Sequence, residues 1–196
     1  MNIFDIVGPV MVGPSSSHTA GAVRIGFVAR KLLGESVKKA ELLLYGSFLA
    51  TGKGHGTDRA LVAGLLGMLP DDERVPFSFE EAKNAGMEFS FGEANLKEAH
   101  PNSVVLLLTG ESGKEIEVIG ASLGGGRMKI CKIDGYEANF CAEYPSLIVQ
   151  NVDQPGCVAT VTTMLSVRGI NIATLQLYRD SRGGDAVMVV ECDREV

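Results

Sequence analysis

The sequence predicts an α+β fold in which helices pack on a mostly antiparallel sheet, followed by a smaller, partial ferredoxin-like unit. Apolar residues at helical spacing dominate between residues 20 and 85, and strand-sized apolar runs follow between residues 87 and 133. From residue 146 the order becomes strand, helix, strand and strand, which is typical of the start of a ferredoxin-like unit. We therefore place one domain at residues 1–143 and a second at residues 146–196.

The elements of the first domain follow from apolar spacing and from glycines. The predicted helices cover residues 20–33, 57–68 and 78–85, and the predicted strands cover residues 40–45, 87–91, 103–108, 115–121 and 127–133. In the first helix Val23 and Phe27 lie at helical spacing, and Gly34 follows as the residue that ends it. Small residues such as Gly21 and Gly26 indicate that another element packs very close to this helix.

The second domain is predicted from a shorter stretch of chain. Its strands cover residues 147–149, 170–178 and 186–191, and its helix covers residues 157–167. So short a chain has difficulty burying a core of its own. We therefore expect this unit to lean on the first domain, or to lack the last helix and strand of a complete ferredoxin-like unit.

Composition excludes several classes of protein. The chain carries 18 Lys and Arg against 24 Asp and Glu, a net charge of −6, which argues against binding nucleic acid through clustered basic side chains. No apolar run approaches the ~20 residues of a membrane-spanning helix, and the N-terminus lacks a basic signal-peptide region. A cytoplasmic protein is expected. The 24 glycines exceed the roughly 14 of an average chain, which indicates left-handed turns or close approach of a ligand to backbone.

The four cysteines offer no metal site. They are Cys131, Cys141, Cys157 and Cys192, at irregular spacings and without a CxxC pair. This pattern is neither a zinc site nor an iron–sulfur ligand set, so reduced thiols are expected and no metal ligand is predicted on this chain.

The segment GPSSSHTAG at residues 13–21 is the most informative one. Its polar side chains directly precede a predicted helix, where unpaired backbone N–H groups and the helix dipole favour an anion. A carboxylate or a phosphate would suit the site. The alternative is a helix cap with spare serines. The candidate binding residues are Ser15, Ser16, Ser17, His18 and Thr19.

A second segment, GKGHGTD at residues 52–58, places a histidine between glycines. It is not a phosphate-binding P-loop, because five residues separate Gly46 from Gly52 and glycine replaces Ser or Thr after Lys53. Gly54 and the glycine at position 56 would give a ligand room beside His55, whose imidazole can act as a general base near neutral pH. The alternative is a histidine in a surface loop.

Three further segments carry weaker signals. His100 precedes a proline and Asn102, and taken alone it is best explained as a structural residue. Glycines at 124–126 interrupt the strand pattern where the backbone must bend or approach something. The loop from Asn151 through Asp153 to Gly156 precedes a helix, so capping is the first interpretation and amino-acid binding the second.

Taken together, these segments resemble the β chain of the iron–sulfur-dependent bacterial L-serine dehydratases. The resemblance rests on GPSSSHTAG at 13–21, LYGSFLATGKGHGTD at 44–58, HPNS at 100–103 and SLGGG at 122–126. The second domain resembles an ACT domain through DQPG at 153–156 and RGINI at 168–172. The first domain is also similar to a substrate-sensing module of some phosphoglycerate dehydrogenases.

The resemblance implies an L-serine ammonia-lyase that forms pyruvate and ammonia with a [4Fe–4S] cluster held by a separate α chain. His55 would then be the catalytic base, with an α-chain residue as the alternative. The residues from Ser15 to Thr19 would line the carboxylate end of L-serine, and Thr57 and Asp58 would orient the base or the substrate amine. The resemblance further implies that the base and the substrate-binding residues are surrounded by Lys53, His100, Asn102, Gly124 and Gly125. Effector binding is assigned to Asn151, Asp153 and Gly156.

Two other functions stay open at this point. A non-catalytic amino-acid sensor would also need an anion-binding helix start and an ACT-like tail. An assembly scaffold would instead be insensitive to substitution of Ser16 or His55. The expected partners are the α subunit and L-serine, together with a second copy of the β chain.

Overall fold

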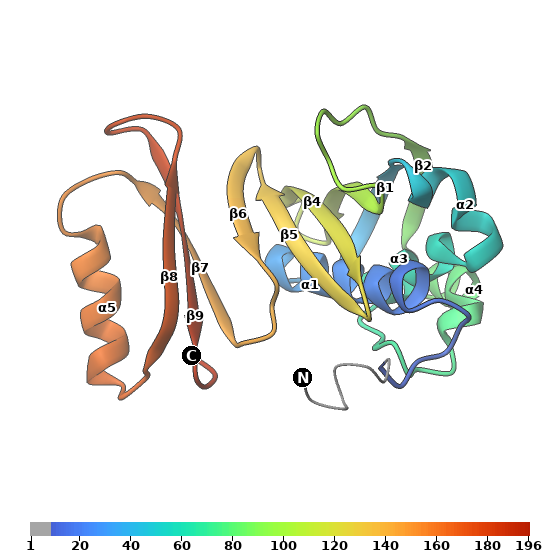
Figure 1. Ribbon diagram of the computed structural model, residues 1–196, viewed down its shortest axis with the longest axis horizontal. Coiled ribbons are helices and arrows are strands. Elements are labelled where there is room, and N and C mark those ends of the chain that lie inside the picture. The colour runs from blue at the N-terminus through green and yellow to red at the C-terminus, as the bar shows by residue number, and fades with distance from the viewer. Residues whose placement is uncertain (1–8) are drawn as a thin grey trace. The chain divides into compact units, whose positions relative to one another are not determined.

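The computed structural model describes residues 9–196, which divide into two compact units between Ile130 and Cys131 (Figure 1). The sequence placed this boundary later, between residues 143 and 146. The difference arises because β6 (Tyr136–Phe140), which follows the division, contacts the strands of the second unit. The polypeptide therefore changes units within a strand and not at a linker.

The first unit contains helices and a mixed sheet. Its elements are η2, a π-helix (Ser16–Ala20), α1 (Gly21–Leu33), β1 (Val37–Leu44), α2 (Ser47–His55), α3 (Thr57–Leu65), η3, a 3-10 helix (Val75–Phe77), α4 (Ser78–Asn84), β2 (Glu88–Glu93), β3 (Ser103–Gly110), β4 (Glu115–Gly124) and β5 (Arg127–Ile133), which crosses the division. These strands belong to a six-stranded sheet with the order β2-β1-β3-β4-β5-β6. The predicted α+β class is confirmed.

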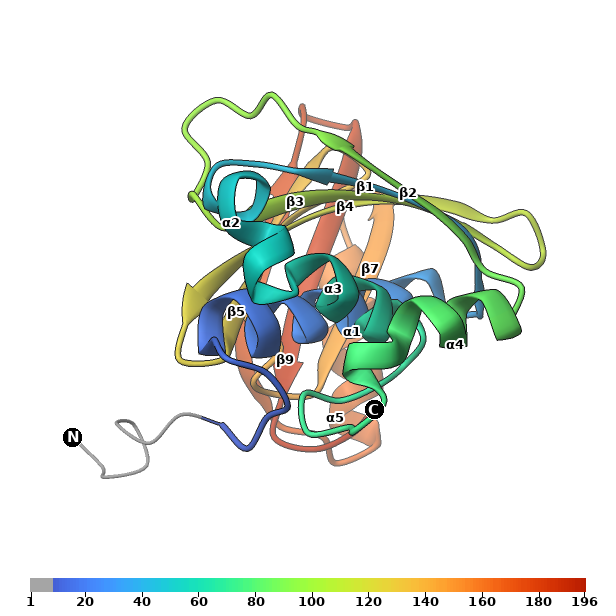
Figure 2. The ribbon, with the colours of Figure 1, turned by 90° about the vertical axis from the view of Figure 1, so that its right-hand side faces the viewer.

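The sheet pairs strands in both directions. Strand β1 is parallel to β2 and antiparallel to β3, and β3 is antiparallel to β4. Helices α1, α3 and α4 lie along one face of this sheet (Figure 2). The apolar core lies between the two layers and includes Ile25, Leu42 and Leu106, all fully buried. Burial of this face accounts for the alternating or continuous apolar runs of the strands.

Helices α1 and α3 approach each other through glycines. A Cβ atom at Gly64 of α3 would overlap the carbonyl oxygen of Val23 in α1, and one at Gly26 of α1 would overlap the carbonyl oxygen of Leu61 in α3. The expectation of a close neighbour at Gly26 is therefore confirmed. This contact holds α1, which directly follows the candidate residues of η2, against α3, which carries the candidate residues Thr57 and Asp58.

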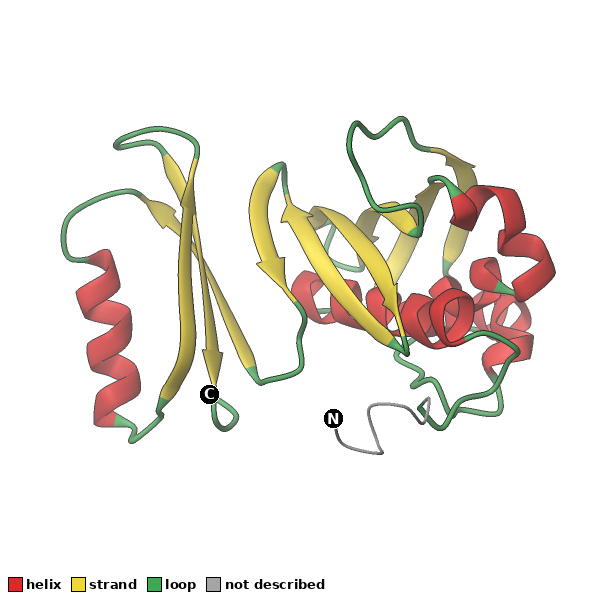
Figure 3. Cartoon of the chain, in the orientation of Figure 1, coloured by secondary structure: helices red, strands yellow, loops and turns green. Residues whose placement is uncertain are grey.

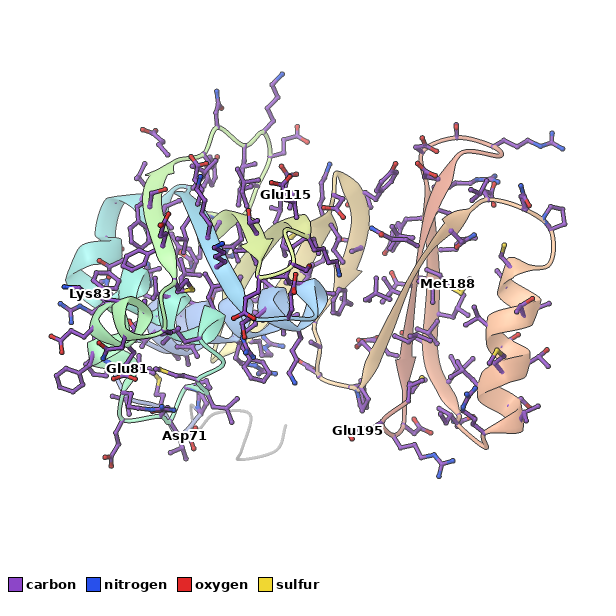
Figure 4. All side chains as sticks on the ribbon, turned by 180° about the vertical axis from the view of Figure 1, so that it is seen from behind. Asp71, Glu81, Lys83, Glu115, Met188 and Glu195 are labelled. Carbon is purple, nitrogen blue, oxygen red and sulfur yellow. The ribbon has the colours of Figure 1, made fainter. Side chains whose placement is uncertain are left out.

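The second unit is a three-stranded antiparallel sheet with one helix. It contains β6, β7 (Ser146–Val152), α5 (Cys157–Val167), β8 (Ile172–Arg179) and β9 (Asp185–Cys192), with β9 between β7 and β8. Helix α5 lies along one face of this sheet (Figure 3). Met188 lies among the side chains between the sheet and α5 (Figure 4), and it belongs to a core that includes Leu165 and Val190. Assignment of this unit to the ACT domains stays a prediction.

Four of the described elements were not predicted from the sequence, namely strand β6, helix α2 and the short helices η2 and η3. Glycine is unfavourable inside a helix by about 1 kcal/mol relative to alanine, so Gly52 and Gly54 argued against helix locally. Packing outweighs this cost, because the side chain of Phe48 in α2 is fully buried. Within residues 9–196 none of the helices has the length and apolar character needed to cross a membrane.

Candidate functional site

The polar segment before α1 forms a cap and a π-helical turn. Ser15 is the N-cap of η2, and its Oγ accepts a hydrogen bond from the backbone N–H of His18 at 3.1 Å. The capping interpretation is therefore confirmed for Ser15. Ser16 and Ser17 are half-buried, whereas Thr19 is only 3% exposed and its Oγ1 donates to the carbonyl oxygen of His55 at 3.2 Å. This bond joins the two segments that the sequence singled out.

The imidazole of His18 lies at the centre of a cluster of hydroxyl groups. Its Nε2 lies 3.1 Å from Ser47 Oγ and 3.1 Å from Thr51 Oγ1. Its Nδ1 lies 3.5 Å from Ser15 Oγ. The ring also packs edge-on against Phe48, with 5.5 Å between ring centroids. The ring is therefore held on both edges and on one face.

His55 lies at the end of α2 beside His18. The two imidazole centroids are 4.9 Å apart, and the side chain of His55 is exposed. The alternative of a histidine in a surface loop does not hold, because α2 continues through Gly54 to His55. Gly56 ends the helix with φ +70°, a left-handed conformation that glycine adopts without strain. Gly56 therefore has a structural role as the residue that terminates the helix.

The helical conformation of α2 brings together residues that the sequence analysis did not connect. Ser47, Thr51 and His55 are spaced four residues apart, so they share one face of α2. Ser47 and Thr51 were not predicted as site residues. Their four-residue spacing with His55 was the available signal, but it has meaning only in a helix.

Burial and a neighbouring imidazole make His18 less basic. Removal of water lowers the pKa of His18 below its usual 6.5, and the positive charge of a protonated His55 lowers it further. A hydrogen bond with the backbone at Ser47 opposes these effects. His18 is therefore neutral at pH 7, and of this pair His55 is the more exposed imidazole.

The residues after His55 differ in their surroundings. Thr57 is fully buried, and within the described part of the chain its Oγ1 has no hydrogen-bond partner. The carboxylate of Asp58 accepts a hydrogen bond from the backbone N–H of Arg59 at 2.8 Å. The side chain of Lys53 lies outside the described part of the structure. Of these three predicted residues, Thr57 alone presents a buried polar atom that still requires a partner.

Residues 100–102 contact the start of α2 through hydrogen bonds and a close backbone approach. The Nδ1 atom of His100 accepts a hydrogen bond from the backbone N–H of Asn102, and the ring is exposed, which favours the structural interpretation of this histidine. The carbonyl oxygen of Pro101 accepts from the backbone N–H of Ser47 at 2.7 Å. A Cβ atom at Gly46, where φ is +58°, would overlap that same carbonyl group. This segment therefore positions the start of α2.

The triple glycine approaches the serine-rich turn. Gly124, Gly125 and Gly126 all have positive φ, and a Cβ atom at Gly124 would lie 3.4 Å from Ser17 Oγ. The expectation of a close backbone approach is confirmed at Gly124. The preceding Ser122 was overlooked as a site residue, although it is fully buried and its hydroxyl has no hydrogen-bond partner among residues 9–196. No pattern around Ser122 marks it as a buried hydroxyl.

The loop before α5 has a different construction. Asp153 pairs with Arg179 at 2.7 Å and also accepts from the backbone N–H of Gly183, and the bond to Arg179 is the main cause of its lowered pKa. Helix α5 begins at Gly156, with φ +99° and without a side-chain cap, so the capping prediction was wrong. The Nδ2 atom of Asn151 donates to the carbonyl oxygen of Val152. Effector binding by Asn151, Asp153 and Gly156 stays a prediction.

The donor groups of this chain do not fit an iron–sulfur cluster. Within residues 9–196 no group of three or more His, Cys, Asp or Glu side chains converges as a metal site. The cysteines are thiols, and Cys192 lies in the core of the second unit, where burial and then Asp193 raise the pKa of its thiol. We therefore derive no step of a mechanism through a cluster on this chain.

Comparisons with known proteins identify relatives of this chain. Residues 2–86 match the family model of the serine dehydratase beta chain. The chain is 43% identical to the L-serine dehydratase beta chain of Peptoniphilus asaccharolyticus, over 97% of this chain and 86% of that protein. It is 39% identical to the probable L-serine dehydratase beta chain of Bacillus subtilis, over 100% and 88%, respectively. It is also 29% identical to a D-3-phosphoglycerate dehydrogenase of Methanocaldococcus jannaschii, over 89% of this chain and 33% of that protein. The chain belongs to the serine dehydratase beta chain family.

Proposed function

We propose that this chain is the β subunit of an L-serine dehydratase that converts L-serine to pyruvate and ammonia. In this proposal an α subunit holds a [4Fe–4S] cluster and closes the active site against the exposed side of α2. Family membership supports the reaction class. The observation that carries the assignment to this site is the exposed imidazole of His55, 4.9 Å from the neutral imidazole of His18.

His55 takes the role of general base in this proposal. It accepts the proton from the α-carbon of L-serine, and the β-hydroxyl leaves with a proton as water, which yields aminoacrylate. Aminoacrylate tautomerises to an imine, and water then releases pyruvate and ammonia. An exposed imidazole suits the first step, because the imidazole ring is a common general base in enzymes and this one is accessible to a substrate.

The hydroxyl groups around η2 take the role of substrate binding. Ser16 and Ser17 are half-buried, and Ser17 lies opposite the turn at Gly124, so their hydroxyl groups are the proposed donors to the substrate carboxylate. The unpartnered hydroxyl of Thr57 is a further donor for a polar group of L-serine. In this proposal Ser15 supports the site indirectly, because its hydroxyl caps η2 and lies beside Nδ1 of His18.

Substitution of His55 tests the proposal in the reconstituted enzyme. His55→Ala, co-purified with the α chain, should lower the rate of pyruvate release by about 10²–10⁴-fold, as expected for loss of a general base. His100→Ala is the matched control, because its exposed ring lies in a local turn and its loss should leave turnover near wild type. Turnover above about a tenth of wild type in His55→Ala would assign the base to the α chain.

A non-catalytic amino-acid sensor is the second candidate function. The similarity to a D-3-phosphoglycerate dehydrogenase over 89% of this chain favours it, because that enzyme carries this region beside a different catalytic activity. Calorimetry with L-serine separates the two functions. Tight binding of L-serine by the isolated chain, without turnover after any α chain is added, would support the sensor.

A further inference from the structure

The geometry around His18 points to a positioning role for Thr51, and we infer that Thr51 fixes His18 as the neutral tautomer with hydrogen on Nε2. This inference rests on the proposed function for its catalytic meaning, but the tautomer itself is a property of the isolated chain.

The hydroxyl proton of Thr51 is already committed. Its Oγ1 donates to the carbonyl oxygen of Ser47 at 2.8 Å, a bond to the preceding helical turn that threonine commonly forms. A hydroxyl group has one hydrogen, so toward any second partner Thr51 Oγ1 can only accept. That second partner is Nε2 of His18 at 3.1 Å. The contact is a hydrogen bond only if Nε2 carries the hydrogen.

The opposite edge of the ring is consistent with the same tautomer. Ser15 Oγ accepts the backbone N–H of His18, so its own hydrogen remains available as a donor. Nδ1 of His18 lies 3.5 Å from this oxygen and can accept that hydrogen only if it is unprotonated. Ser47 Oγ, 3.1 Å from Nε2, can accept a share of the same N–H. The Nε2 edge of the ring therefore favours hydrogen on Nε2, and the Nδ1 edge is compatible with a lone pair on Nδ1.

This arrangement divides the roles of the two imidazoles. Nε2 of His18 donates to Thr51 Oγ1, which in turn donates to the carbonyl oxygen of Ser47. These hydrogen bonds hold the ring of His18 beside that of His55. Neither nitrogen of His18 then faces a substrate as a base. Proton exchange with a substrate falls to His55, whose side chain is exposed. Thr51 acts through His18 and is a positioning residue, not a catalytic one.

Nitrogen NMR of the full chain tests the tautomer without any partner. The chain has three histidines, so ¹⁵N-histidine labelling gives three ring systems that are assigned by substituting each in turn. At pH 7.5 the ring of His18 should show a pyrrole-type Nε2 and a pyridine-type Nδ1. Hydrogen on Nδ1, or two averaged nitrogen shifts, would overturn the inference, and this result requires no variant that might fail to fold.

Three substitutions test the role of Thr51. Thr51→Val removes the acceptor at nearly constant volume, so the two nitrogen shifts of His18 should move toward each other as the tautomers mix. Thr51→Ser restores the hydroxyl and should restore the wild-type shifts. Thr162→Val is the matched control, because Thr162 forms the same bond to the preceding turn in α5 of the other unit. Unchanged His18 shifts in Thr51→Val would overturn the role of Thr51.

Steady-state kinetics of the Thr51 variants, reconstituted with the α chain, test whether the tautomer of His18 matters for catalysis. Thr51→Val should lower kcat by about tenfold to a hundredfold with little change in KM, since a misplaced ring disturbs orientation more than binding. Thr51→Ser should recover most of kcat. Wild-type kcat in Thr51→Val would overturn the catalytic meaning of the inference. Absence of turnover with every α chain, combined with the expected tautomer, would overturn the proposed function and leave the positioning of His18 intact.

Discussion

Two polar segments lead into helices, one in each unit, and they are built in opposite ways. Before α1, Ser15 caps the turn and the hydroxyls around it converge on the imidazole of His18. Before α5, the carboxylate of Asp153 is already paired with Arg179, and the helix begins at a glycine without a side-chain cap. Both segments attract attention in the sequence for the same reason, which is polar residues at the start of a helix.

The comparison teaches that the two segments differ in how their charges are paired and not in whether unsatisfied polar atoms occur, because the buried Oδ1 atom of Asn151 in the second unit also lacks a partner among the described residues. The first unit keeps two buried hydroxyls, at Thr57 and Ser122, without partners among the described residues. Asp153 in the second unit has its charge compensated by its own neighbour. An unpaired buried hydroxyl costs about 1–3 kcal/mol, so Thr57 and Ser122 are positions in the first unit where hydrogen bonding to a bound polar group would recover free energy.

The largest expected effect concerns the packing that supports the first segment. Gly64→Val should lower the free energy of unfolding of the first unit by about 3 kcal/mol or more, because the new side chain would overlap the backbone of Val23. Ala159→Val on the exposed surface of α5 should change it by less than about 1 kcal/mol. Thermal unfolding of both variants measures the difference. Equal stability of the two would show that α1 and α3 can separate without cost.

The second-largest effect is a gain in stability on substitution of Thr57. Thr57→Val should raise the free energy of unfolding by about 1 kcal/mol, because it removes a buried hydroxyl that lacks a partner and keeps the shape. The same variant should bind L-serine more weakly if that hydroxyl contacts the substrate. Thr162→Val in α5, where the hydroxyl is bonded, should not stabilise the chain. Urea unfolding tests both, and destabilisation by Thr57→Val would mean that the hydroxyl is satisfied.

Loss of the cap is the third effect. Ser15→Ala should cost about 1 kcal/mol, the usual value for a serine N-cap. Gln154→Ala, near the start of α5, should have no comparable effect, because no side chain caps that helix. Urea denaturation of the two variants compares the two helix starts. A cost of Gln154→Ala as large as that of Ser15→Ala would remove the distinction between them.

Acidification should lower the stability of the first unit, by less than the loss of the Ser15 cap does. The pKa of His18 is lowered in the folded chain, so the unfolded chain binds a proton more readily below pH 6.5. Stability from the neutral ring is therefore complete above pH 6.5 and decreases as pH falls from there toward the folded pKa. Melting temperatures of wild type and His18→Asn between pH 5 and 8 should converge toward the acidic end. Parallel curves would mean that His18 titrates normally.

The smallest effect is expected in the second segment. Asp153→Asn should lower stability at neutral pH only slightly, because the pair with Arg179 is near the surface, and added salt should reduce the difference. The pKa of Asp153 is lowered, so its contribution is present above the unfolded pKa and is lost as pH falls through the folded value. Salt-dependent melting measures it. A difference that persists in high salt would indicate more than an ion pair.

Several parts of the fold followed from the sequence, because they depend on local preferences. The helix α1 was recognised from the spacing of Val23 and Phe27 and from Gly34, which has φ +84° as expected of a left-handed end. The strands β3 and β4 and their connection followed from apolar runs around a glycine-containing turn. In each case the chain neighbours alone set the conformation, so the printed sequence was sufficient.

The candidate site was predictable only in part. The segments around His18 and His55 were chosen from residue type, and the structure brings their imidazoles together. The roles of Ser47 and Thr51 were missed, because no helix was predicted over residues 47–55. The glycines at positions 52 and 54 disfavour a helix locally, whereas Phe48 of α2 is fully buried, and no local pattern reports that burial.

By itself, the sequence determined the α+β class, the two polar segments and membership of a family through its motifs. Tertiary structure alone decided that Ser47, Thr51 and His55 share one helical face toward His18 and that Asp153 is neutralised by Arg179. It also decided that the hydroxyls of Thr57 and Ser122 are buried without a partner among the residues that the structure describes. The physical reason is the range of the interactions. Helix ends and strand runs depend on neighbours within about four residues, whereas the contacts of His18 with Ser47 and Thr51 join residues about thirty positions apart.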